Sequence, residues 1–219
     1  MWHEKAWLDN GPVPARDIHR GRHGRNTIYF PSIKNGTQVI CESALEASYC
    51  VWLEWDSDVK AYYAQPHTFK WKSGGASLHY TPDFFVIHHT GANHFTEVKP
   101  DFLRTTRHNL TTLEAFTELC EQWSIQFKKA DARQILQPVR LANLKWLYSR
   151  LHLISAFEID YCAQFLAQLN QPITWGKCLS VEHPPSVRAV ARAIFNGEVI
   201  VDLNQPLTQA TLLKKRPIL

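Results

Sequence analysis

The segment YTPDFFVIHHTGANHFTEVKP, residues 80–100, determines the fold that we expect for this chain. Two strongly apolar runs, 83–88 and 94–99, flank the turn-forming residues 90–93, Thr-Gly-Ala-Asn. This pattern predicts a β-hairpin, and Pro100 ends its second strand because proline has no amide hydrogen to donate. Two apolar arms of this kind favour a position inside a central sheet.

Polar residues stand at the open end of this hairpin. Pro82-Asp83 opens the first arm, and Glu97-Val98-Lys99 closes the second. Side chains alternate along a strand, so Glu97 and Lys99 share one face and Val98 takes the opposite, core-facing one. Pairing of the two arms brings Asp83 to the same end as Lys99. The sequence therefore predicts that two carboxylates and an ammonium group converge there.

This set of groups suits metal-assisted hydrolysis of a phosphodiester, which needs a cation, an activated water and compensation of developing negative charge. Mg²⁺ prefers carboxylate and carbonyl oxygens. We expect Asp83, Glu97 and the Val98 backbone carbonyl to hold Mg²⁺, with Mn²⁺ able to substitute, while Lys99 orients water or offsets charge. The alternative is an ordinary surface strand with an exposed Glu and Lys pair.

A third candidate acid is Glu46, which lies on a helix predicted from Ser43 to about Trp55. Glu46 borders the apolar stripe of this helix, where a carboxylate can reach the sheet edge. The segment from Ser43 to Glu46 is also a capping box, in which the Glu side chain bonds back to the helix start. The spacing leaves both roles open. The residues of the apolar stripe are Leu45, Tyr49, Trp52 and Leu53.

The remaining hydropathy pattern predicts an α/β domain with a mixed central sheet and flanking helices. The further strands are expected at 27–30, 36–41, 59–64, 67–72 and 124–128, and the helices at 104–122 and 141–152. Gln65, between two of these strands, is a further candidate at the edge of the site, with a plain polar loop residue as the alternative. Four tryptophans are assigned to packing: Trp52, Trp71, Trp123 and Trp146.

Beyond residue 153 the pattern changes to helices at 156–169 and 186–195, followed by a segment at 196–203 that resembles the hairpin wing of a winged-helix module. We therefore expect three parts. They are a basic arm at 1–26, a catalytic domain at 27–152 and a small, mostly helical, winged-helix-like domain at 153–219.

Composition limits the class of protein. Of 219 residues, 45% are hydrophobic and 12% aromatic, which excludes a disordered chain. No apolar run approaches the roughly 18 residues of a membrane span, so we expect a cytoplasmic protein with no membrane partner. Five cysteines without a CxxC pair indicate free thiols. Zinc at His88, His89 and His94 is disfavoured, because no thiolate lies near them.

Basic residues concentrate at the two ends of the chain, although the net charge is only +4. Such clusters can neutralise DNA phosphates without reading sequence, or they can be solvated tails. The candidates are Arg16, Arg20, Arg22 and Arg25 in the arm, and Lys214, Lys215 and Arg216 near the C-terminus.

Several of these motifs together resemble the TnsA family of transposon endonucleases. The resemblance covers roughly residues 27–151 and rests on the order and spacing of a few short segments. They are Ser43-Ala44-Leu45-Glu46, Leu53-Glu54-Trp55-Asp56, Val59, Gln65-Pro66, Tyr80-Thr81-Pro82-Asp83-Phe84, Thr96-Glu97-Val98-Lys99-Pro100 and Asn143-Leu144-Lys145-Trp146-Leu147-Tyr148.

This resemblance implies a restriction-endonuclease-like fold and a subunit of a heteromeric transposase. Such a subunit cleaves the 5′ strand of double-stranded DNA at transposon ends, an integrase-type subunit cleaves and joins the 3′ strand, and an AAA+ ATPase regulates both. Glu46, Asp83 and Lys99 match the catalytic acid, acid and lysine of the family. Glu97 replaces a glutamine of the best-known member. Short chains of this type resemble those of CRISPR-associated transposons. A free-standing restriction or repair nuclease and an inactive DNA-binding assembly protein are the alternatives.

Overall fold

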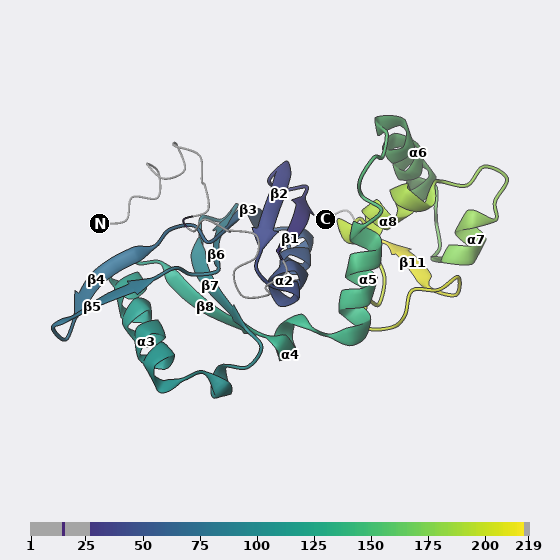
Figure 1. The fold of residues 1–219 in the computed structure, drawn as a ribbon. Coiled ribbons are helices and arrows are strands. Elements are labelled where there is room, and N and C mark those ends of the chain that lie inside the picture. Colours follow the sequence, from purple (N-terminus) through teal and green to yellow (C-terminus); the bar gives the residue numbers. More distant parts are fainter. Residues whose placement is uncertain (1–14, 16–26, 217–219) are drawn as a thin grey trace. The chain divides into compact units, whose positions relative to one another are not determined.

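The computed structural model describes Ala15 and residues 27–216 (Figure 1). Packing divides the chain into two compact units, Met1–Leu136 and Gln137–Leu219. This division lies before the helix that was expected to close the catalytic domain. The domain limits 1–26, 27–152 and 153–219 stay a prediction, and the arm lies outside the described residues apart from Ala15.

A four-stranded mixed sheet organises the first unit, in the order β3-β6-β7-β8. The predicted hairpin is confirmed as β6 (Phe84–His88) and β7 (His94–Lys99), which pair antiparallel with Phe84 opposite Thr96. β3 (Val59–Ala64) adds an antiparallel strand beside β6, and β8 (Gln126–Asp131) adds a parallel strand beside β7. β7 is therefore an interior strand, as its apolar character predicted.

Two helices cover opposite faces of this sheet. Phe84 and Phe85 are adjacent in β6 and so point to opposite faces. Phe84 packs against Tyr49 of α2 (Ala44–Trp55), with ring centroids 5.5 Å apart. On the other face, Phe85 belongs to a buried aromatic cluster that includes Phe116 of α3 (Arg107–Gln122). The start of β6 is thus packed between α2 on one face of the sheet and α3 on the other.

The first unit also contains two antiparallel ribbons outside the central sheet. One joins β1 (Ile28–Ser32) to β2 (Thr37–Cys41), and the other joins β4 (Phe69–Ser73) to β5 (Ala76–Tyr80). The sequence prediction did not include β5, although Ala76, Leu78 and Tyr80 alternate with polar residues in the way that is typical of a strand. The short elements η1 (Phe102–Arg104) and α4 (Ala132–Ile135) complete this unit.

The turn end of the hairpin carries the histidines that were considered for zinc. The His88 ring bonds Asp58 at 2.8 Å and His94 at 3.1 Å. Burial lowers the pKa of His94 to about 3, so this ring stays neutral. Within the described ranges, no three His, Cys, Asp or Glu side chains form a group that could hold a metal ion. The contacts tie the β6–β7 turn to the segment before β3.

The second unit is mostly helical. Its helices are α5 (Pro138–Tyr148), α6 (Ala156–Ala167), α7 (Trp175–Leu179) and α8 (Val187–Phe195). Its small sheet has the order β10-β11-β9, with strands at Val199–Ile200, Leu212–Lys215 and Ile173–Thr174. The segment expected to form a wing supplies β10, whose partner comes from much later in the chain. The winged-helix assignment stays a prediction.

The prediction that Trp146 packs in a core is wrong. This side chain is 37% exposed, and the guanidinium of Arg150 lies over its ring at 3.5 Å. Trp175 is the buried tryptophan of this unit, at 5% exposed. Trp52, Trp71 and Trp123 are partly buried in the first unit. All five cysteines are buried and free, as predicted.

No helix in the part of the chain that the structure describes combines the length and apolarity needed to cross a bilayer.

Phe116 is the central side chain of the aromatic cluster between α3 and the sheet, and it is fully buried. We expect Phe116→Ala to lower the free energy of unfolding by about 3–5 kcal/mol, because it removes apolar contact and leaves a cavity. Denaturant unfolding followed by circular dichroism measures this loss. Phe157→Ala, at a 76% exposed position, is the control and should change stability by less than about 0.5 kcal/mol. Equal losses in both variants would contradict the assignment of this core.

Candidate active site

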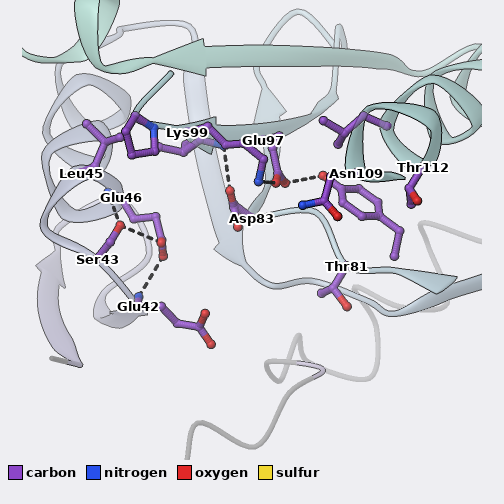
Figure 2. A pocket seen from close by; sticks show the side chains of 14 residues that line it. Glu42, Ser43, Leu45, Glu46, Thr81, Asp83, Glu97, Lys99, Asn109 and Thr112 are labelled. Carbon is purple, nitrogen blue, oxygen red and sulfur yellow. Dashed lines mark hydrogen bonds and ion pairs between the residues drawn. The ribbon is translucent and has the colours of Figure 1, made fainter. Parts of the chain in front are cut away.

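One pocket of about 620 Å³ gathers the four predicted catalytic side chains, Glu46, Asp83, Glu97 and Lys99 (Figure 2). It opens in the first unit between the start of α2, the hairpin end and the start of α3. The other lining residues are Glu42, Ser43, Leu45, Tyr80, Thr81, Val98, Pro100, Asn109, Thr112 and Leu113. Residues from four separate chain segments therefore meet at the place where the spacing predicted convergence.

Asp83 is fixed in this pocket by the backbone of the neighbouring strand. Its Oδ2 accepts a hydrogen bond from the Val98 N–H at 2.7 Å. Its own backbone carbonyl accepts from the Gln65 N–H at 2.8 Å. Burial raises the pKa of Asp83 well above its ordinary value, and the nearby carboxylates of Glu97 and Glu46 raise it further. The site thus concentrates negative charge that a bound cation would stabilise.

Glu97 is held at both carboxylate oxygens. Oε2 accepts from the Tyr80 hydroxyl, and Oε1 contacts the Lys99 ammonium. Burial and the Glu97 charge raise the pKa of Tyr80 well above its ordinary value, so Tyr80 stays protonated and donates. Glu97 is only 5% exposed. The alternative of an ordinary surface strand with an exposed acid therefore does not apply.

Glu46 lies at the start of α2 and uses both carboxylate oxygens there. Oε1 accepts from the Ser43 hydroxyl at 2.8 Å, and Oε2 accepts from the Glu42 N–H at 2.9 Å. Burial raises the pKa of Glu46, because desolvation disfavours its charge. Glu46 thus combines both roles that spacing left open: it bonds at the helix start and it lines the pocket.

The pocket supplies carboxylates, the ligand type that a hard divalent cation prefers, but in this structure the acids of the described residues do not come together as a group of three that could hold a metal ion. Four acids line this pocket, namely Glu42 and the three predicted ones, Glu46, Asp83 and Glu97. Glu97 is held by Tyr80 and Lys99, and Glu46 is held at the helix start. Among the described residues, only the Val98 N–H donates to the Asp83 carboxylate. Of the three predicted acids, Asp83 therefore has the most capacity left for a cation.

Gln65 does not line the pocket, although it lies beside Asp83 in the fold. It is 3% exposed, has a φ of 47°, and its Oε1 has no hydrogen-bond partner among the described residues. Its backbone N–H holds the Asp83 carbonyl. Its position therefore indicates a role in fixing the strand start rather than in touching a substrate.

Two groups of basic residues were proposed for DNA binding. Lys214, Lys215 and Arg216 belong to the second unit, where all three are exposed. The basic residues of the arm, Arg16, Arg20, Arg22 and Arg25, lie outside the described residues.

Three lining residues were not singled out from the sequence. Tyr80 ends β5, immediately before Thr81-Pro82-Asp83, and its hydroxyl orients Glu97. Asn109 and Thr112 lie three positions apart on α3, so they share the helix face that borders the pocket. The signal for Tyr80 was its place next to the acid. Nothing in the α3 sequence distinguishes Asn109 or Thr112 from other polar surface residues.

The family model described as "TnsA-like endonuclease N terminal" matches residues 56–131. The chain carries a TnsA-like endonuclease domain. This domain is a restriction-endonuclease-like fold, in agreement with the mixed sheet and flanking helices. The matched segment includes Asp83, Glu97 and Lys99 but begins after Glu46. No curated protein shows significant similarity to this chain.

Tyr80 provides a test of how the pocket is held together. Tyr80→Phe removes the hydroxyl that donates to Glu97, so we expect the free energy of unfolding to fall by about 1–3 kcal/mol, the cost of leaving a buried acceptor unpaired. Tyr29→Phe is the control, since Tyr29 is 47% exposed, and its stability should match the wild type. Thermal and denaturant unfolding of the full chain provide the measurement. An unchanged Tyr80→Phe variant would show that this hydrogen bond contributes nothing.

Proposed function

We propose that this chain is the Mg²⁺-dependent endonuclease subunit of a heteromeric transposase, hydrolysing the 5′, non-transferred strand at transposon ends during cut-and-paste transposition. The observation that carries the proposal is the meeting of Asp83, Glu97 and Lys99 in one pocket of a TnsA-like endonuclease domain. An integrase-type subunit for the 3′ strand and an AAA+ ATPase regulator are the expected partners.

The side chains of the pocket divide the work of phosphodiester hydrolysis. Asp83 would hold Mg²⁺, with Glu46, Glu97 and the Val98 carbonyl as further candidate ligands. When bound, the cation supplies positive charge against the scissile phosphate and lowers the pKa of a water molecule. Lys99 presents its ammonium to the pocket, where it can orient the attacking water or offset charge on a phosphate oxygen.

Glu97 and Tyr80 keep Lys99 in place for this role. Glu97 contacts the Lys99 ammonium, and Tyr80 fixes the other oxygen of Glu97. A long lysine side chain that is held by a buried carboxylate loses less freedom when the reaction begins. The four pocket side chains also argue against an inactive assembly protein, because such a protein has no need to bury three acids beside a lysine.

Asp83→Asn tests the catalytic assignment. We expect it to reduce strand cleavage in Mg²⁺ at least a hundredfold, since it removes the charge that the cation needs, while DNA association and complex assembly persist. The assay uses the complete transposase assembly and a duplex that carries a transposon end. Asp160→Asn, an exposed acid on α6, is the matched control and should cleave as the wild type does.

Three results distinguish the candidate functions. Equal cleavage by wild type and Asp83→Asn would refute the catalytic assignment. Wild-type cleavage of DNA without transposon ends or partners would favour a free-standing nuclease. Transposition that proceeds with no Asp83-dependent cut would indicate an assembly protein.

Cation binding has a readout that does not depend on cleavage. Because the pKa of Asp83 is raised in the folded state, its ionisation destabilises the fold as pH rises above the unfolded value of about 3.9. In the absence of divalent cations at pH 7, Asp83→Asn should therefore melt at a higher temperature than the wild type. This difference should vanish near pH 3, where the carboxyl is protonated in both states.

Addition of Mg²⁺ or Mn²⁺ should raise the melting temperature of the wild type but not that of Asp83→Asn, because ligands stabilise the state that binds them. Each kcal/mol of binding corresponds to roughly 2–4 °C for a chain of this size. An equal cation effect on both proteins would place the cation elsewhere.

A further inference from the structure

The ribbon formed by β4 and β5 has one apolar and one basic face. Its apolar face packs against Phe116, with ring centroids 5.2 Å away for Phe69, 6.0 Å for Trp71 and 4.6 Å for Tyr80. Figure 1 shows the ribbon extending beside α3. These contacts attach the ribbon firmly to the core of the first unit.

The opposite face of the ribbon is exposed and polar. Alternation along the two strands places Lys70, Lys72, Ser77 and His79 on this face. Lys70 pairs with His79, and Lys72 pairs with Ser77. These residues, which we call the basic ribbon face, line an open groove of about 560 Å³ together with Trp71 and Leu78.

No acid balances these charges nearby in the sequence. Residues 59–82 contain no Asp or Glu, although they contain three lysines and two histidines. Among the described residues, neither Lys70 nor Lys72 forms an ion pair. The basic ribbon face therefore presents unpaired positive charge, which is complementary to a polyanion.

The ribbon is also connected directly to the candidate active site. Tyr80, the last residue of β5, lines the catalytic pocket and donates to Glu97. At about 3.3 Å per strand residue, the basic ribbon face begins about 3 Å from Tyr80 along the strand and ends about 10 Å from it. Double-stranded DNA carries one phosphate charge per roughly 1.7 Å of its axis. The lysines project from the face opposite Tyr80, and a duplex with one phosphate in the pocket carries further phosphates at distances of this order from it.

We propose that the basic ribbon face holds the phosphate backbone of the substrate DNA beside the cut phosphate. This inference rests on the proposed function, because it takes DNA as the substrate. Lys70 and Lys72 supply the charges, and their attachment through Tyr80 places the DNA in a fixed position relative to the pocket. The contact is independent of sequence, since lysines bound to phosphates read no bases.

The test compares two double variants of the full chain that lose the same charge. The first is Lys70→Gln with Lys72→Gln. The control is Lys60→Gln with Lys177→Gln, two exposed lysines outside the ribbon. Binding to a duplex of arbitrary sequence is measured by fluorescence anisotropy over a range of NaCl concentrations, without divalent cations. No cleavage occurs under these conditions, so the result does not depend on catalysis.

We expect the ribbon variant to bind DNA at least tenfold more weakly than the wild type at low salt. The slope of the logarithm of its association constant against log [NaCl] should be smaller in magnitude by about 2, roughly one for each lost phosphate contact. The control should keep the wild-type slope. An unchanged slope in the ribbon variant, or an equal reduction in the control, overturns the proposal. Wild-type DNA binding combined with lost assembly of the transposase would show that the ribbon face binds protein, and it also overturns the proposal.

Failure of the proposed function has a different signature. If Asp83→Asn cleaves normally while the ribbon variant shows the reduced slope, DNA binding by the ribbon stands and the catalytic assignment falls. If Asp83→Asn abolishes cleavage while the ribbon variant binds as the wild type does, the nuclease stands and this inference falls.

Discussion

The hydrogen bond from the Val98 N–H to the Asp83 carboxylate joins the chemistry of this protein to its fold. Asp83 immediately precedes β6 and Val98 lies within β7. The position of the Asp83 carboxylate is therefore set by the pairing of these two interior strands. Any change that shifted this pairing by one residue would turn Glu97 and Lys99 to the other face of the sheet. The candidate site therefore depends on strand register more than on any single side chain.

Burying several acids together costs folding free energy, and the rest of the first unit offsets this cost. Like charges in a site of low polarity raise the pKa of Asp83, which destabilises the folded protein at neutral pH. Phe84 and Phe85 bury apolar area on both faces of the sheet directly after Asp83. The strongest apolar packing thus lies next to the most unfavourable charge, and it keeps the acids close together in a pocket that a cation can enter.

Local sequence patterns were sufficient to predict the hairpin, α2 and the convergence of the named side chains. Apolar alternation fixes strands such as β7, and Ser43 marks the start of α2 by capping its free amides. The missed features differ in kind. The alternation of Ala76, Leu78 and Tyr80 with Ser77 and His79 is a local strand signal that we overlooked for β5, whereas the role of Tyr80 requires Glu97 from another strand. Trp146 packs against the buried Trp175 at the edge of the core, where Arg150 lies over its ring, and no local pattern shows that it stays 37% exposed there.

The candidate pocket and the basic ribbon face both suit contacts with phosphates, which do not depend on the DNA sequence. On the proposed function, the pocket would act on a phosphate, which is the same at every step of a duplex, and the lysines of the basic ribbon face would also contact phosphates. The residues that line the ribbon groove include no Asn, Gln or Arg, the side chains that read base edges in pairs, and Asn109 is the one such side chain that lines the pocket. The proposal of a subunit in a larger assembly accounts for this arrangement, because a partner can then bind the specific DNA sequence while the pocket supplies the chemistry.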